Sequence, residues 1–171
     1  MDIRGLPSLQ DQKYQTNRWT NIIGETAAAL DGFEEITSIK GIGARAAAIF
    51  LSGIGDVNDF ATADKLAAYV GIVPRVAASN GVEIHGRITK QGNKLVRTTL
   101  VQCTLSAIRY SGYLNTFYRR IKERRGSGKA IIATARKLLT IIYNTLKNNW
   151  IFEDFPAFKI KNTRQTAGQT S

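Results

Sequence analysis

Residues 129–150 read KAIIATARKLLTIIYNTLKNNW, and this stretch decides the fold class. Its apolar side chains recur at steps of four, three, four and four residues, at Ile131, Ala135, Leu138, Ile142 and Leu146. That spacing places them on one face of an α-helix. We therefore expect a helix from Lys129 to Trp150 with one buried face.

Helical patterns continue on the amino-terminal side of this stretch. A helix is expected to begin at Asn93 or Lys94 and to run to about Arg109. A further apolar stripe over residues 114–121 predicts another helix, which the glycines in residues 126–128 interrupt. Upstream of these helices, Val82 to His85 alternate between apolar and polar residues, and this pattern predicts a short strand or extended arm.

A glycine hairpin lies between two short helical patterns in residues 36–49, ITSIKGIGARAAAI. Gly41 and Gly43 allow a tight turn and leave backbone N–H groups at a helix N-terminus, where the partial positive charge suits a phosphate. The pattern predicts a helix-hairpin-helix element; the alternative is an ordinary corner between two helices with glycine as the C-cap. The fold class is therefore all-α, one compact helical domain with at most a short β arm.

The chain divides into four segments by composition and period. We expect an irregular terminus over residues 1–18, a helix over 19–34, a main domain over 35–150 and a polar tail over 151–171. The stripe of the second segment begins at Trp19 and ends at Phe33. Two heptads do not define a coiled coil, so this helix either packs on its own domain or is the end of a longer, truncated coiled coil.

Length and composition indicate a globular protein. A chain of 171 residues with 43% hydrophobic residues can bury roughly 70% of its unfolded surface. No apolar run reaches the ~18 residues of a membrane span, and the first twenty residues are too polar for a signal peptide. We expect no membrane association and a cytoplasmic location. Cys103, the only cysteine, lies within an apolar helical pattern and is expected to be a buried thiol.

The net charge of +11 is concentrated in one part of the chain. Residues 86–137 contain thirteen Lys and Arg against one acid, Glu123, whereas the rest of the chain contains eleven Lys and Arg against twelve acids. A surface that serves only solubility normally mixes both signs. The segregation favours a polyanionic partner such as DNA, because phosphate contacts supply most nucleic-acid affinity.

A serine loop precedes the most basic motif of the chain. Ser79 is expected in a loop over residues 74–81, followed by GRITKQGNKLVR at residues 86–97. A hydroxyl next to clustered cations suits attack on a phosphodiester, although a serine in such a loop is most often only a turn residue. His85 is the only histidine, so no metal-site spacing is present.

Five motifs in this order resemble one protein family: IKGIG at residues 39–43, LAAYVGIVP at 66–74, Ser79, GRITKQGN at 86–93 and ARKLL at 135–139. Together they are similar to the carboxy-terminal serine domain of DEDD-type insertion-sequence transposases of the IS110 and IS116 class. The resemblance runs from about residue 19 to residue 147, nearly without gaps. Asn80 departs from the pattern, since the residue after the serine is usually glycine.

The resemblance implies an RNA-guided recombinase built in two parts. One part is a RuvC-like domain whose four carboxylates hold divalent metal; a coiled coil links it to the domain that supplies the serine nucleophile. The resemblance places that nucleophile at Ser79. No RuvC-like pattern precedes Trp19, so we expect Mg²⁺ only with a separate RuvC-like domain, no cofactor in this chain, and little activity from the chain alone.

From the residues, the hypothesis assigns roles to the cations and glycines around Ser79. Gly92 would allow close backbone approach, and the scissile phosphate would be clamped by Arg87, Lys90 and Arg97. A duplex or a guide RNA would be tracked by Arg119, Arg120, Arg124 and Arg125. Expected partners are DNA, a guide RNA and further copies of the chain, as a dimer or tetramer, in a bacterial or archaeal cell.

Two other readings remain open. A truncated remnant would bind nucleic acid without catalysis through its hairpin and basic helices. A ribosomal or chromatin-like structural protein would explain the charge but not the Ser79 motif. An upstream RuvC-like reading frame would favour the transposase over the remnant.

Overall fold

A computed structural model of the chain describes residues 8–79, 82–88, 92–152 and 160–162. Within these ranges the chain is mainly helical, with two antiparallel pairs of strands. Its elements are α1 (Leu9–Ala28), α2 (Phe33–Thr37), α3 (Ala44–Ile54), the 3₁₀ turn η1 (Val57–Asp59), α4 (Ala63–Val70), β1 (Pro74–Ser79), β2 (Val82–Ile88), α5 (Lys94–Tyr110), α6 (Gly112–Arg125), α7 (Ser127–Asn148), β3 (Trp150–Phe152) and β4 (Ile160–Asn162). The all-α class with a helix-hairpin-helix element and a β arm is confirmed.

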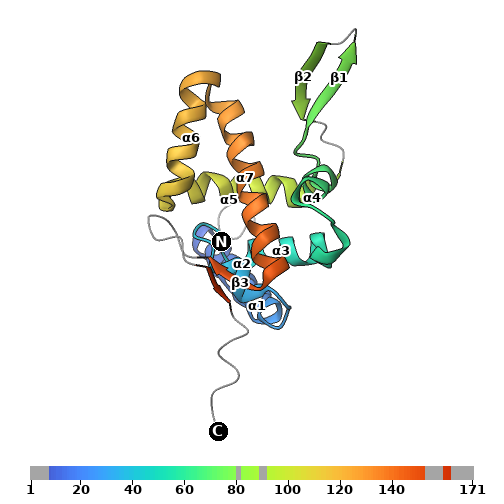
Figure 1. Cartoon of the computed structure of the whole chain (residues 1–171). Helices are drawn as coiled ribbons and strands as arrows, with labels where there is room; N and C mark the ends of the chain where they lie inside the picture. Colours follow the sequence, from blue (N-terminus) through green and yellow to red (C-terminus); the bar gives the residue numbers. More distant parts are fainter. Residues whose placement is uncertain (1–7, 80–81, 89–91, 153–159, 163–171) are drawn as a thin grey trace.

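Helix α7 is the centre of the fold (Figure 1). It packs against α2, α4, α5 and α6. Of the predicted apolar face, Ala135, Leu138 and Ile142 are buried, whereas Ile131 and Leu146 are partly buried. It begins at Ser127 and ends at Asn148, where Asn149 adopts a left-handed conformation with φ 51°. Asn tolerates this conformation better than most residues, and the turn stops the helix before Trp150, which the sequence had placed inside it.

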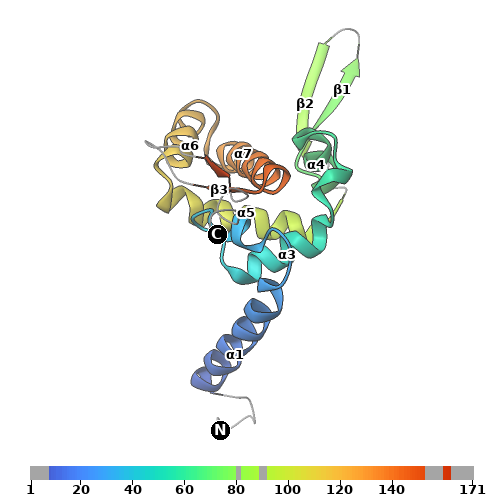
Figure 2. The same ribbon diagram turned by 60° about the horizontal axis from the view of Figure 1, so that its bottom comes forward.

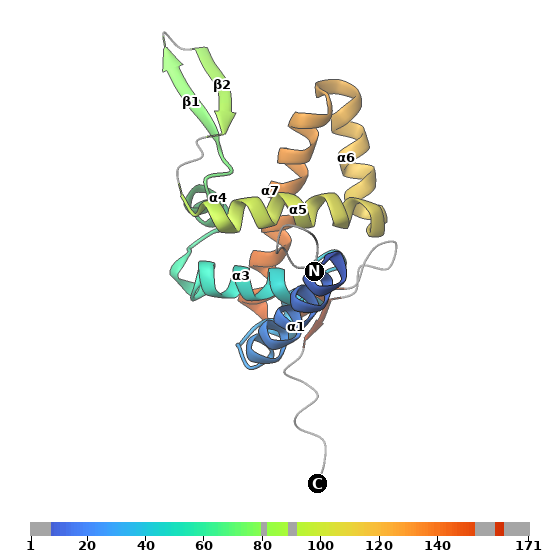
Figure 3. The same cartoon turned by 180° about the vertical axis from the view of Figure 1, so that it is seen from behind.

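Helices α3 and α5 form a layer across α7, seen from behind in Figure 3. The contacts at the two ends of α3 show that the helices run antiparallel, because Gly41 lies against Ala107 and Gly53 lies against Val96. The core is continuous through this layer. Its largest fully buried side chains are Phe50, Ile36, Ile39, Leu66, Ile72, Leu100, Leu114, Leu138, Leu139, Ile142, Val70 and Val96.

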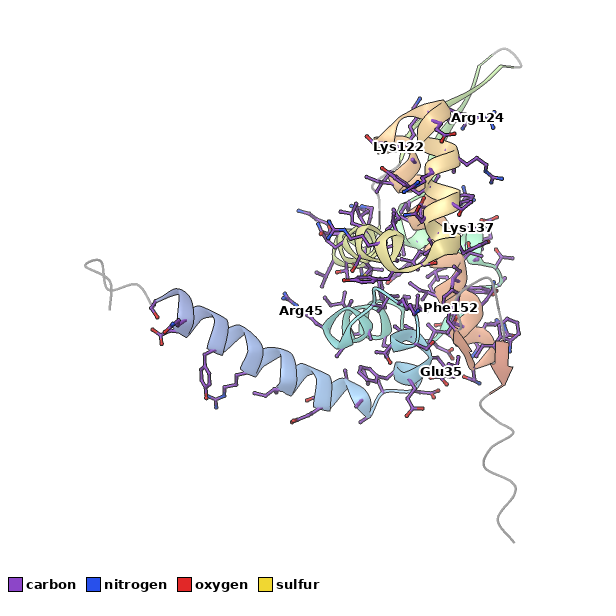
Figure 4. The ribbon with its side chains drawn as sticks, turned by 90° about the vertical axis from the view of Figure 1, so that its left-hand side faces the viewer. Glu35, Arg45, Lys122, Arg124, Lys137 and Phe152 are labelled. Carbon is purple, nitrogen blue, oxygen red and sulfur yellow. The ribbon has the colours of Figure 1, made fainter. Side chains whose placement is uncertain are left out.

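Helix α1 begins earlier and ends earlier than the sequence pattern predicted. It starts at Leu9 because the Ser8 hydroxyl accepts from the Asp11 N–H while the Asp11 carboxylate accepts from the Ser8 N–H, a reciprocal capping box. The prediction of an irregular segment is therefore wrong for residues 9–18. The helix ends at Ala28, and Gly32 at φ 84° separates it from α2. Figure 2 and Figure 4 show α1 extending away from the other helices.

Strands β1 and β2 form an antiparallel hairpin, which we call the arm. Ser79 pairs with Val82 at its distal end, and Pro74 pairs with Ile88 at its base. The prediction of a β element near residue 83 is confirmed, whereas the loop expected from Pro74 is a strand as far as Ser79. The arm and the α6–α7 hairpin project on the same side of α5 (Figures 1 and 3).

The segment after α7 returns to the core. Strand β3 pairs with β4, and the Phe152 N–H donates to the Ser38 hydroxyl over 2.8 Å. Phe152 is buried, so the segment expected as a polar tail packs on the core at this position. In the described part of the chain no helix is long and apolar enough to cross a membrane.

Candidate nucleic-acid interface

The helix-hairpin-helix element consists of α2, the turn at Gly41 and α3. Gly41 has φ 101°, and a Cβ at this position would lie 2.7 Å from the backbone nitrogen of Ala107 in α5. Gly43 caps α3 with no side-chain hydrogen bond, and a Cβ there would meet nothing within 4 Å. Gly41 is therefore a glycine because α5 approaches it closely, whereas Gly43 leaves the N-terminus of α3 open.

An open groove of about 580 Å³ lies between this N-terminus and α5. Its walls combine Arg45 from α3 with Thr98, Thr99 and Gln102 from α5, and Leu95 is 62% exposed at its edge. Figure 4 shows Arg45 projecting from α3 on the side from which α1 extends. Backbone N–H groups, a guanidinium and hydroxyls are the donors that contact phosphates without reading bases.

Cys103 also lines the groove but is only 6% exposed. Burial raises the pKa of the Cys103 thiol to about 11, because removal from water disfavours the thiolate. The prediction of a buried thiol is confirmed, and the group remains a neutral thiol at physiological pH.

The end of the basic motif is anchored on α4 through Gly92, Asn93 and Arg97. Gly92 has φ 125°, and a Cβ there would collide with the Tyr69 carbonyl. The following Asn93 N–H donates to that carbonyl over 3.3 Å, and the Asn93 side chain caps α5 by accepting from the N–H groups of Leu95 and Val96. Gly92 thus lies close to α4, and its predicted close approach to a phosphate stays a prediction.

Arg97 also contacts the C-terminal end of α4. Its Nη1 donates to the Val70 carbonyl at the end of α4 over 3.0 Å, and the side chain is half-buried. A cation at a helix C-terminus is also favoured by the helix dipole. The phosphate role given to Arg97 from the sequence stays a prediction, and the structure adds a contact that spacing did not indicate.

The remaining residues around the proposed nucleophile lie on the arm. Ser79 is the last residue of β1 and Arg87 precedes the last residue of β2, so the two are at opposite ends of the hairpin. Lys90 lies outside the described residues. The backbone register therefore does not bring Ser79 and Arg87 together within the arm.

The α6–α7 hairpin carries the densest exposed positive charge among the described residues. The exposed cations around its turn are Arg119, Arg120, Lys122, Arg124, Arg125 and Lys129, and Lys147 is exposed near the other end of α7. Figure 4 places Lys122 and Arg124 toward the distal end of the hairpin and Lys137 nearer to α5.

Aromatic rings hold several of the cations on this hairpin. The Lys137 ammonium lies 5.1 Å from the ring centre of Tyr113 and 5.2 Å from that of Phe117. The Arg120 guanidinium lies 5.5 Å from the ring centre of Phe117. Such contacts orient cations without neutralising them. The hairpin therefore presents a fixed positive surface suited to phosphates.

A sequence model of the transposase IS116/IS110/IS902 family matches residues 33–119, about half of the chain. The chain belongs to this family. The match begins at α2 and extends into α6, so the family region includes the helix-hairpin-helix element, the arm and the first part of the basic hairpin.

Curated relatives agree with this assignment. The transposase for insertion sequence element IS1111A from Coxiella burnetii is 30% identical over 124 residues, which cover 70% of this chain and 34% of the relative. The pilin gene-inverting protein of Moraxella bovis is 35% identical over 123 residues, with coverage of 69% and 38%. The insertion element IS110 uncharacterized 43.6 kDa protein of Streptomyces coelicolor is 28% identical over 120 residues, with coverage of 69% and 29%. This IS110-family chain thus spans about a third of the length of these relatives.

The sequence did not predict the contacts that Tyr69, Asn93 and Gly53 make in this IS110-family chain. Tyr69 donates its hydroxyl to the Gly53 carbonyl over 3.0 Å, and the Asn93 side-chain amide reaches the same oxygen over 3.5 Å. No local pattern indicates these contacts, because the partners are 16 and 40 residues apart. In the described ranges no three His, Cys, Asp or Glu side chains gather as a metal site.

Proposed function

We propose that this chain is the part of a DNA transposase that binds DNA and supplies a serine nucleophile for strand cleavage and exchange in DNA transposition. The observation that carries the proposal is the register of the arm, in which Ser79 pairs with Val82 at the end farthest from the helices. A residue at the distal end of a projecting arm is placed to reach the surface of another molecule. We assign the role to the main domain, residues 35–150.

In the proposed reaction the Ser79 Oγ attacks the phosphorus of a DNA phosphodiester. The Oγ–P bond forms, the P–O bond to one strand end breaks, and the hydroxyl proton passes by way of a base to the departing strand oxygen. A strand hydroxyl later attacks the same phosphorus and releases the serine. Because one ester replaces another in each step, no external energy source is needed. An unassisted serine is a weak nucleophile, so a base or a polarised phosphate is required.

Positive groups of this chain would bind the DNA around that reaction. Arg87, at the opposite end of the arm from Ser79, and Lys90 would contact neighbouring backbone phosphates, and the open N-terminus of α3 at Gly43 would also contact the backbone. The exposed cations of the α6–α7 hairpin would bind a duplex or the guide RNA that the resemblance implies. Divalent metal belongs, in that resemblance, to a RuvC-like domain, and we route no step through it.

The test combines the chain with a RuvC-like partner domain and supercoiled or nicked DNA, and detects a covalent protein–DNA adduct on a denaturing gel. We expect an adduct with the parent chain and none with Ser79→Ala. Ser52→Ala is a matched control, because Ser52 is an exposed serine whose hydroxyl donates to the Ala48 carbonyl within α3. An undiminished adduct with Ser79→Ala would refute the nucleophile.

A second function rests on the α6–α7 hairpin alone. Its exposed cations need no nucleophile to bind a polyanion, so a non-catalytic nucleic-acid-binding protein fits the same surface. That function predicts salt-sensitive binding that Ser79→Ala leaves unchanged, with no adduct under any condition. The adduct assay separates the two.

A further inference from the structure

All four carbonyl groups at the C-terminal end of α4 accept hydrogen bonds. A helix leaves its last four carbonyls without partners inside the helix. Here Gly71, in a left-handed conformation, donates its N–H to Ala67 and Ala68, and Ile72 N–H also reaches Ala67. The last two carbonyls are taken by residues that follow the arm.

Those two partners are Asn93 and Arg97. The Tyr69 carbonyl accepts from the Asn93 N–H over 3.3 Å, and the Val70 carbonyl accepts from Arg97 Nη1 over 3.0 Å. The chain leaves α4 toward the arm at Gly71, and it returns from the arm at Gly92. Both ends of the arm are therefore held by one helical turn.

This turn is itself fixed to α3 through a single carbonyl. Gly53, in the last turn of α3, accepts from the Tyr69 hydroxyl and from the Asn93 amide. The Tyr69 ring lies against Phe60, with ring centres 5.3 Å apart. The ends of α3 and α4 and the start of α5 thus meet in one hydrogen-bonded junction at the base of the arm.

We propose that Arg97, Asn93 and Tyr69 are positioning residues that set the direction in which the arm leaves the domain, and thereby the place of Ser79. The part of this proposal that concerns Ser79 rests on the function proposed above. The hydrogen-bonded junction does not depend on that function. Arg97 acts in this assignment through the Val70 carbonyl and not through a phosphate. Its planar guanidinium fixes a direction, which a lysine ammonium on a flexible stem does less well.

The direction of the arm can be measured without any activity. Spin labels are attached to Glu83→Cys on β2 and Thr140→Cys, an exposed position on α7, in a Cys103→Ala background. Pulsed dipolar spectroscopy then gives the distribution of distances between arm and body. We expect one narrow distribution in the parent, a broadened or displaced one in Arg97→Met, and partial recovery in Arg97→Lys.

Two further variants make the measurement decisive. Arg109→Met removes an exposed cation from the same helix, away from the junction, and should leave the parental distribution unchanged. Tyr69→Phe removes only the donor to Gly53 and keeps the ring, so it tests the junction should Arg97→Met fail to fold by circular dichroism. A broad distribution in the parent, or parental distributions in folded Arg97→Met and Tyr69→Phe, would overturn the proposal.

The adduct assay adds a readout that a loss of folding would not mimic. In Arg97→Met we expect DNA affinity within about twofold of the parent and adduct formation slowed on the order of 10²-fold, as for a nucleophile displaced by roughly 1 Å. A matched loss of affinity would instead indicate a phosphate contact and overturn the positioning role. If the parent forms no adduct, the nucleophile is refuted while the distance measurement still decides the junction.

Discussion

Replacing Gly41 with alanine separates a packing role from a phosphate-binding role. The residue has φ 101°, a region in which a Cβ costs roughly 1–2 kcal/mol. The new Cβ would also lie 2.7 Å and 2.8 Å from backbone atoms of Ala107, which cannot rotate away, and such overpacking costs about 1–3 kcal/mol. We expect Gly41→Ala to lower the free energy of unfolding by ~2–5 kcal/mol, a large part of the ~5–15 kcal/mol of a typical domain.

Urea unfolding followed by circular dichroism measures this change, and a thermal scan should show a melting temperature lower by about 5–20 °C. Gly43→Ala is the matched control two residues away. Its φ is −92° and a Cβ there meets nothing within 4 Å, so its stability should change by less than about 1 kcal/mol. Equal stabilities of Gly41→Ala and the parent, together with lost DNA binding in Gly41→Ala, would refute the packing argument.

Other features give sharper local tests. Burial raises the Cys103 pKa to about 11 from its ordinary value of 9.0, so at alkaline pH the folded state keeps a proton that the unfolded state loses. The contribution of Cys103 to the free energy of unfolding is therefore fully present below pH 9 and is lost as the pH rises toward 11. Urea unfolding should show this decrease in the parent, and the Cys103 contribution to it should be absent in Cys103→Ala. Replacing Arg124 and Arg125 together with glutamine should reduce the slope of log affinity against log salt by about 2 in a DNA-binding titration, whereas Lys147→Gln, near the opposite end of α7, should not change it. Ser8→Ala should speed hydrogen exchange in the first turn of α1 and cost roughly 0.5–2 kcal/mol of local stability, and unchanged protection there would contradict the capping box.

Much of the helical fold can be predicted because its signals are local. The spacing from Ile131 to Leu146 identifies α7 and its inward face. Two signals that the predictions left unused were also local. Ser8 and Asp11 form an S-x-x-D capping pattern before α1, and Asn80–Gly81 between two extended stretches is a common hairpin dipeptide. Because Ala77 and Ala78 have little strand preference of their own, residues 74–81 were predicted to form a loop. The strand β1 was therefore missed.

The site was less predictable because its contacts are distant in sequence. Residue type alone suggested phosphate contacts for Gly92 and Arg97, and those contacts stay predictions. The structure adds a contact of Arg97 with a carbonyl 27 residues away, at a helix end whose position depends on tertiary packing. The same holds for Gly41, whose reason for being glycine is the backbone of Ala107. The predicted roles of Ser79 and of the exposed arginines concern other molecules, and only binding and cleavage assays test them.

The central position of α7 has a consequence for how the domain forms during synthesis. Helices α2, α4 and α5 leave the ribosome before the helix against which they pack, and Phe152 closes on Ser38 across 114 residues. Contacts this far apart along the chain form late and slowly. Copies of the gene interrupted before α7 should therefore yield chains with exposed apolar surface that aggregate or are degraded. A stable folded protein should form only when nearly the whole region is translated.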